Sequence, residues 1–166
     1  SSDSTNLSAL LDGVNVKKYE TEALNNKLGY VSQKAVIFTG SVKDNVSYGH
    51  NGKDKPTEEQ IKEAVKVAQA KSFVEKMDKK YDSHIARGGT NISGGQKKLI
   101  SLARTLLKES KMIILDEATA PLDKDKVKNV INMLKKLKKN HTIIVITHKK
   151  EIVNLADQVI KIDKGK

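Results

Sequence analysis

The 166-residue sequence contains no cysteine and no tryptophan, and no apolar run approaches the roughly 18 residues that a membrane-spanning helix needs. Without cysteine, disulfide bonds, thiolate metal sites and cysteine nucleophiles are excluded, and a reducing compartment such as the cytosol is the natural expectation. The amino terminus, SSDSTNLSALL, lacks the basic and then apolar pattern of a secretory signal. The chain alone is therefore expected to be soluble and, at this length, to fold as one domain.

Arginine is scarce as well, so lysine supplies almost all of the net charge of +11. A charge of this size can indicate nucleic acid or anionic lipid as a partner. The lysines are spread over every segment, however, aromatic residues make up only 4%, and the densest run, at 135–139, falls on the polar face of a predicted helix. A solvated surface explains the charge better, and no specific nucleic acid partner is expected.

The first half of the chain predicts short strands followed by helices. SALLDGVNV predicts a hairpin with its turn at Asp12-Gly13, and LGYVSQ predicts a strand that ends at Gln33. Pro56 and Thr57, followed by acidic residues, predict the start of a helix. Further helical pieces are expected at 20–27, 42–46 and 72–76, and a loop at 81–91.

The sequence NISGGQKKLISLAR, residues 91–104, places two adjacent glycines at the start of an amphipathic helix. Ser93 is at the N-cap position and adds a hydroxyl donor. Because Gly94 and Gly95 have no Cβ, backbone amides at the helix start can approach an anion closely, and the positive end of the helix dipole favours phosphate there. For this motif in isolation, a glycine-rich first turn without a ligand is the simpler interpretation.

Two later apolar runs, KMIILDE and HTIIVITH, predict buried parallel strands separated by a helix that begins at Asp123. A helix through Ile152 and Leu155 then leads to a last predicted strand, QVIKI. Alternation of strands and helices predicts a parallel sheet with helices on its faces.

Three of the predicted strands end in polar residues, which are Gln33, the pair Asp116-Glu117, and His148. Ligands of parallel α/β sheets bind at the carboxyl ends of the strands. A hydrophobic run followed at once by Asp is the Walker B arrangement, in which the carboxylate holds the Mg²⁺ of a nucleotide, and Glu117 could polarise an attacking water. Taken alone, a carboxylate pair that simply ends a strand is the alternative.

The order of the motifs GYVSQ, SGGQ, MIILDEATAPLD and IVITH resembles that of the nucleotide-binding domain of ABC transporters over nearly the whole chain. The four motifs match its Q-loop, its signature motif, its Walker B motif with the D-loop, and its H-loop. QKAVIFTGSVKDNVSYG and YDSHIARGGTNISGGQ further resemble exporter-type members. The resemblance implies an α/β fold of the P-loop NTPase type, with residues 1–41 and 108–166 in a mostly parallel sheet core and residues 42–107 in an inserted helical subdomain.

The resemblance implies that the motifs bind and hydrolyse ATP with Mg²⁺. Asp116 supports the metal, Glu117 acts as the general base, and His148 contacts the γ-phosphate. Gln33 senses both the metal and the attacking water.

A second nucleotide-binding domain, identical or different, is the implied partner. In this family two domains hold two ATP molecules head to tail, and Asp123 belongs to the D-loop that touches the opposing domain. The signature residues face the γ-phosphate of the nucleotide that the partner holds: Ser93, Gly94, Gly95 and Gln96. Transmembrane domains are implied as well, which puts the chain on the cytoplasmic side of the cell membrane.

One family motif, the phosphate-binding loop G-x-x-x-x-G-K-[ST], does not occur in this sequence. The chain resembles the carboxyl-terminal two-thirds of the domain, with a core incomplete at its amino-terminal side. We therefore expect the isolated chain to bind ATP very weakly and not to hydrolyse it. Two alternatives to an exporter motor are a soluble ABC ATPase acting on nucleic acid and a degenerate module that supplies only its signature face to a complete partner.

Overall fold

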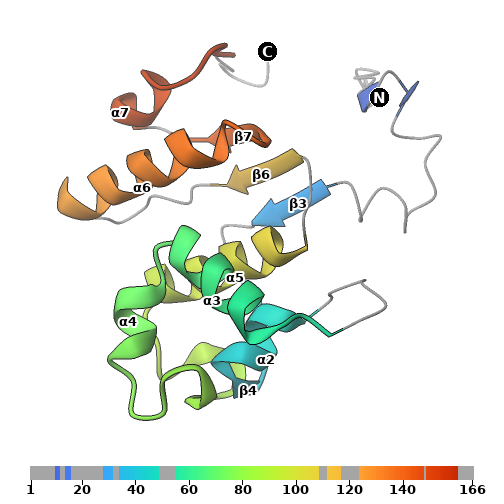
Figure 1. Cartoon of the computed structure of the whole chain (residues 1–166). Coiled ribbons are helices and arrows are strands. Elements are labelled where there is room, and N and C mark those ends of the chain that lie inside the picture. Colours follow the sequence, from blue (N-terminus) through green and yellow to red (C-terminus); the bar gives the residue numbers. More distant parts are fainter. Residues whose placement is uncertain are drawn as a thin grey trace, which may run out of the picture.

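The protein has an α/β fold with a three-stranded parallel sheet (Figure 1). The computed structural model describes residues 10–11, 14–15, 28–31, 34–48, 55–108, 112–116, 124–147 and 149–160. The strands are β3 (Leu28–Val31), β6 (Met112–Asp116) and β7 (Thr142–Ile146), in the order β3-β6-β7. The predicted parallel sheet is thus confirmed.

The predicted amino-terminal hairpin is confirmed too, because β1 (Leu10–Leu11) pairs antiparallel with β2 (Val14–Asn15). Its turn at Asp12-Gly13 and the helical piece predicted at 20–27 lie outside the described residues.

Each described segment that was predicted to be helical contains a helix. Their bounds are Val42–Ser47 for α2, Glu58–Val67 for α3, Lys71–Glu75 for α4, Gly94–Leu107 for α5, Lys124–Leu137 for α6 and Lys150–Val153 for α7. Helix α7 ends before Leu155, which was expected to continue it. None of the helices in the described ranges is long and apolar enough to cross a bilayer.

The segment predicted as a loop, 81–91, carries short regular structure. The 3-10 helix η2 (Lys80–Asp82) leads to β5 (His84–Ile85), which pairs antiparallel with β4 (Gly40–Ser41), and η3 (Arg87–Gly89) follows. A two-residue strand is too short to leave a period in the sequence, so the pairing could not be predicted from pattern. It joins the segment before α2 to the segment before α5.

One face of the sheet packs into the hydrophobic core. Val31 of β3 and Ile113 and Leu115 of β6 are buried there, and Ile143 and Val145 of β7 pack against the core from the same face. Helices α5 and α6 supply much of the rest of the core, through Ile100, Leu102, Ala103, Leu107, Met133, Leu134 and Leu137.

The other face of the sheet is open in the described part of the chain. Tyr30, Ile144 and Ile146 are 55%, 45% and 50% exposed. The prediction that HTIIVITH forms a buried strand is therefore wrong for β7, because no described element covers this face and β7 is the last strand on its side of the sheet.

The predicted strand QVIKI is also wrong over its described part, 158–160, which is irregular. Val159 and Ile160 are 56% and 78% exposed, and no described strand lies beside them to pair with. An apolar run forms a stable strand only when a neighbour takes up its backbone hydrogen bonds.

Candidate nucleotide-binding site

The amino-terminal end of α5 is closed by a capping box. The Ser93 side-chain oxygen accepts a hydrogen bond from the Gln96 amide at 3.1 Å, and the Gln96 side-chain oxygen accepts one from the Ser93 amide at 2.9 Å. Ser93 was predicted as the N-cap. The reciprocal bond was missed, although a serine followed three residues later by glutamine is the sequence signal for it.

Within the described part of the chain, the amides of Gly94 and Gly95 remain available at this helix end. No acceptor among the described residues takes a hydrogen bond from either amide. A Cβ added at Gly94 would meet no atom within 4 Å, and one added at Gly95 would meet only the Ser93 hydroxyl oxygen, at 4.0 Å. Packing among the described residues therefore does not require glycine here. The open space suits an anion from outside the chain, bound at the positive end of the helix.

The carboxylate of Asp116 lies at the carboxyl end of β6 and is held from the neighbouring strand. The Tyr30 hydroxyl of β3 donates a hydrogen bond to Asp116 Oδ2 at 3.2 Å, and this bond, with the negative charge, raises the pKa of Tyr30. The other carboxylate oxygen, Oδ1, accepts no hydrogen bond from the described residues. An oxygen ligand of this kind suits Mg²⁺.

Tyr30 is a site residue that the sequence analysis missed. Tyr30 pairs with Ile114 in the register of β3 and β6, so its side chain is on the same face as that of Asp116. The register of two strands far apart in the sequence would have been needed to find it.

The structure brings the ends of the three strands to one edge of the sheet, because β3, β6 and β7 are parallel neighbours. Helix α5 runs antiparallel to β6, so its glycine-rich end lies toward the same edge (Figure 1). Four of the predicted site residues lie outside the described residues: Gln33, Glu117, Asp123 and His148.

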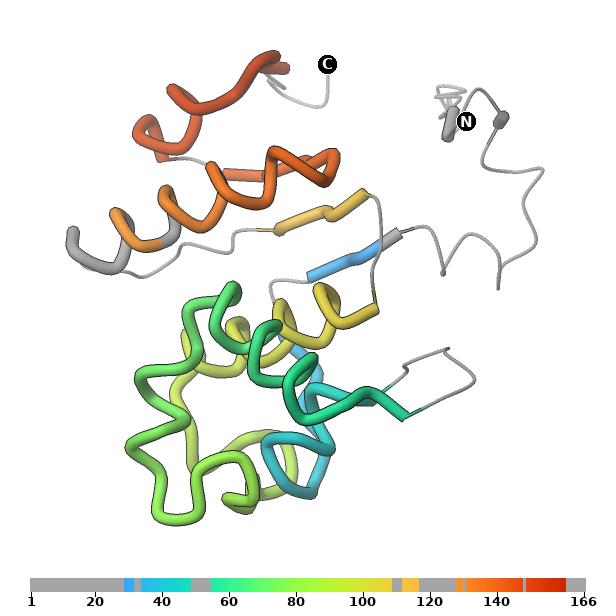
Figure 2. Tube along the Cα trace, in the orientation of Figure 1, coloured from blue at the N-terminus to red at the C-terminus, as the bar shows by residue number. Residues whose placement is uncertain are grey.

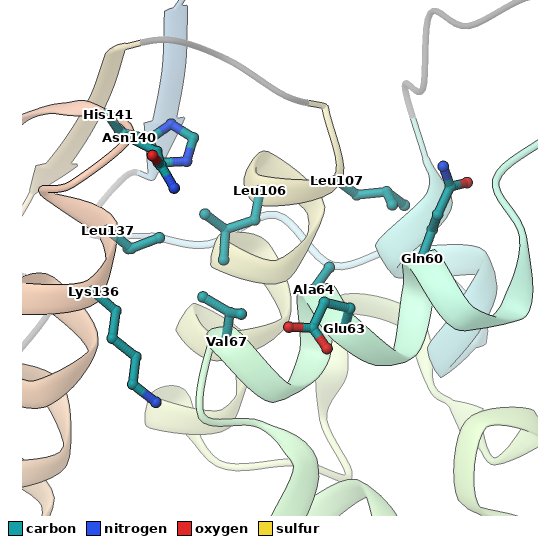
Figure 3. Close-up of a pocket in the computed structure, with 10 residues that line it drawn as sticks. All are labelled: Gln60, Glu63, Ala64, Val67, Leu106, Leu107, Lys136, Leu137, Asn140 and His141. Atoms are coloured by element: carbon teal, nitrogen blue, oxygen red, sulfur yellow. The ribbon is translucent and has the colours of Figure 1, made fainter.

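A cavity of about 430 Å³ lies elsewhere, between α3, α5 and α6 (Figure 3). Leu106 and Leu107 line it from the last turn of α5, about 18 Å along the helix from Gly94 at 1.5 Å per residue. It contains none of the predicted site residues. The described residues also contain no cluster of three or more His, Asp or Glu side chains that could hold a metal ion.

Comparison with known families identifies the class. The family model described as "ABC transporter" matches residues 3–120, and the chain belongs to this family. It is 37% identical over 94% of its length to ABC transporter B family member 21 of Arabidopsis thaliana, and 38% identical over 94% to the ATP-dependent lipid A-core flippase of Haemophilus influenzae. Those matches span 12% and 26% of the two relatives.

Within the family, the chain corresponds to part of an ATP-binding domain of the exporter type. A solved structure of a bacterial Atm1-family ABC exporter with ATP bound superimposes on 94% of the chain with a TM-score of 0.84 and 28% sequence identity. The match covers 27% of that exporter chain. The α/β fold of P-loop NTPase type that the motif order implied is thereby confirmed.

Proposed function

We propose that the chain is part of the ATP-hydrolysing motor of an ABC exporter, in which two nucleotide-binding domains close head to tail around ATP and drive transport across a membrane. The observation that carries the proposal is the open end of α5. The Gly94 and Gly95 amides are free of acceptors in the described chain, and their missing side chains leave room for a phosphate.

The roles of individual residues follow the family motifs. Ser93, Gly94, Gly95 and Gln96 face the γ-phosphate of ATP held by the partner domain, and Asp123 touches that partner. At the nucleotide of this domain, Asp116 supports Mg²⁺, Glu117 activates water, and Gln33 and His148 contact the metal and the γ-phosphate.

The capping box leaves the Ser93 hydroxyl able to donate a hydrogen bond to phosphate. Its oxygen accepts the hydrogen bond from the Gln96 amide, so its own hydrogen stays available for a phosphate oxygen. A bound Mg²⁺ supplies charge neutralisation at the phosphates, and the free oxygen of Asp116 is the ligand that the described residues offer it.

The proposed partners are a second nucleotide-binding domain, identical or different, and the transmembrane domains of an exporter on the cytoplasmic side of the membrane. We retain the division into a core (1–41 and 108–166) and a helical subdomain (42–107). The likeness to lipid A-core flippases and to an Atm1-family exporter supports export.

The test mixes this chain with a partner domain that has an intact phosphate-binding loop and an inactivated signature serine of its own. ATP hydrolysis in the mixture then depends on the α5 end of this chain. Ser93→Ala should abolish the stimulated ATPase, because it removes the hydroxyl donor.

A matched control separates this effect from loss of the helix cap. Thr57 forms the same capping box with Gln60 at the start of α3, at 3.2 and 2.9 Å. Thr57→Ala and Ser93→Ala should each lower the free energy of unfolding by about 1 kcal/mol, but Thr57→Ala should leave the stimulated ATPase intact. Equal loss of ATPase in both variants, or no stimulation by the unmodified chain, would refute the proposal.

A further inference from the structure

Arg104, in the last turn of α5, reaches across to a segment nearly sixty residues earlier in the chain. Its Nε donates a hydrogen bond to the Asn45 carbonyl oxygen at 2.8 Å, and its Nη1 donates to the Val36 carbonyl oxygen at 3.0 Å. Its Nη2 also lies 3.5 Å from Asn45 Oδ1. One guanidinium thus contacts two points of the segment 36–45.

The guanidinium is held by neutral groups. It lies 5.2 Å from the ring centre of Phe38 and 5.8 Å from that of Tyr48, and these two rings stack at 4.0 Å. Burial lowers the pKa of Arg104, and no carboxylate in the described part of the chain forms an ion pair with it. Arg104 is partly buried, and withdrawing part of a charge from water is costly unless its hydrogen bonds and ring contacts are kept, so the contact is specific.

Asn45 ties the segment together through the hydrogen bonds of its side chain. Its side chain is 1% exposed and is fully engaged: Nδ2 donates to the carbonyl oxygens of Phe38 and Ser41 at 2.9 and 3.1 Å, and Oδ1 accepts from the Phe38 amide at 2.9 Å. The chain from Phe38 to Asn45 is therefore closed into an arch. Through its hydrogen bonds to the carbonyl oxygens of Val36 and Asn45, Arg104 connects α5 to this arch and to the chain just before it.

The two joined elements belong to two different motifs. Val36 is three residues after Gln33, and α5 carries Ser93 and the two glycines at its other end, about 15 Å along the axis at 1.5 Å per residue. Helix α2 begins inside the arch at Val42, ends beyond it at Ser47, and packs directly against α5. Figure 2 shows both segments in the same helical part of the chain. A displacement of the segment after Gln33 must therefore move α5 as well while the Arg104 contacts hold.

We propose that Arg104 is a positioning residue that locks the segment 36–48 to α5, so that the chain following Gln33 and the phosphate-facing end of α5 move as one body. This inference rests on the proposed function for its consequence in catalysis. Lysine cannot replace arginine here, because a single ammonium cannot reach both carbonyl oxygens as a planar fork while lying against two rings.

The lock itself is tested by amide hydrogen exchange on the full chain. In Arg104→Lys, exchange should become at least about tenfold faster both in α2 and in the first turns of α5, while β6 keeps its protection. The control is Thr105→Val, which removes the hydrogen bond from the buried neighbouring hydroxyl to the Ser101 carbonyl oxygen, 3.0 Å, within α5. Thr105→Val should leave the rate of amide exchange in α2 unchanged.

The catalytic consequence is tested in the assembled ATPase described above. Arg104→Lys should lower kcat by about tenfold with KM for ATP changed less than about twofold, since fewer assemblies hold both motifs in place at once. Thr105→Val should leave kcat unchanged even if it lowers the thermal midpoint of unfolding as much as Arg104→Lys does.

Each outcome decides the matter. Faster exchange in both α2 and α5, together with a selective loss of kcat, supports the proposal that Arg104 joins the two. If Arg104→Lys changes exchange in α2 alone or nowhere, the proposal is overturned. An unchanged kcat of this variant in an active assembly also overturns it. If the unmodified assembly hydrolyses no ATP, the proposed function has failed, and the exchange pattern alone decides whether Arg104 joins the two elements.

Discussion

The Tyr30 hydroxyl on β3 donates its hydrogen bond to Asp116 Oδ2 on β6, across 3.2 Å, and both residues lie on the open face of the sheet. Asp116 is the carboxylate that the family motif assigns to Mg²⁺. A hydrogen bond to one of its oxygens fixes the direction in which the other points, which is how outer partners orient metal ligands in general.

Removing this hydroxyl should weaken the use of Mg²⁺ without unfolding the chain. For Tyr30→Phe in the assembled ATPase, we expect the Mg²⁺ concentration for half-maximal activity to rise about tenfold, the lower end of the range for outer partners. Tyr81→Phe is the control, because it removes a tyrosine hydroxyl from the helical part of the chain. Identical Mg²⁺ dependence in all three proteins would contradict the role of Tyr30.

Replacing Gly95 by alanine should stabilise the chain and impair the site. No atom of the described chain lies closer than 4.0 Å to the added Cβ, so alanine should raise the free energy of unfolding by about 0.5 kcal/mol through the unfolded state. In the assembled ATPase the same methyl group should lower activity about tenfold, because it occupies the approach to the amides. Urea unfolding and ATPase assays measure the two effects.

Gly88→Ala is the matched comparison for that prediction. Gly88 also has open space around it, but its φ is +67°, a conformation that alanine adopts only with strain. Gly88→Ala should therefore lower the free energy of unfolding by about 1 kcal/mol. If Gly95→Ala destabilises as Gly88→Ala does, the α5 end is not preformed as described.

The two faces of the sheet should respond differently to truncation. Ile113→Ala removes a fully buried side chain and should cost about 3 kcal/mol of unfolding free energy. Ile144→Ala, on a strand hydrogen-bonded to β6, removes a side chain that is 45% exposed and should cost under about 1.5 kcal/mol. Urea unfolding of both variants measures the difference. Equal costs would mean that the open face is covered in solution.

The elements of this fold that could be predicted are those that local sequence specifies. The cap at Ser93, the period behind it and the apolar run that forms β6 each lie within about a dozen consecutive residues. Helix α2 was predicted for the same reason. Their confirmation reflects signals that need no knowledge of the rest of the chain.

What could not be predicted depends on contacts between distant segments. The Tyr30 to Asp116 bond spans 86 residues and the Arg104 to Asn45 bond spans 59, and neither leaves a pattern in the sequence. The prediction that β7 is buried was wrong for a related reason. An apolar run shows that a strand can be buried, but only its neighbours decide whether both of its faces are covered.

The pH dependence of α2 should follow Asp44. Hydrogen bonding by Ser41, through its side chain and then its backbone amide, lowers the pKa of Asp44 below 3.8. Its stabilising contribution is thus complete above the unfolded value, near 3.8, and is lost as pH falls through the lower folded value. Because Asp44 is exposed, the effect should stay well under about 1 kcal/mol. NMR titration of the α2 amides measures it, and Asp44→Asn should remove the acid transition.

ATP binding by the chain alone should be very weak, because the pattern G-x-x-x-x-G-K-[ST] does not occur in its sequence. In P-loop enzymes the amides and lysine of that loop provide most of the phosphate affinity, whereas the α5 end offers only the Ser93 hydroxyl and two amides that no described acceptor engages. Calorimetric titration of ATP with Mg²⁺ into the chain should give no saturable heat at micromolar concentrations. Adding the complete partner domain should restore tight binding, and Ser93→Ala should weaken it again. A tight one-to-one titration of the isolated chain would show that its described residues bind nucleotide by another route.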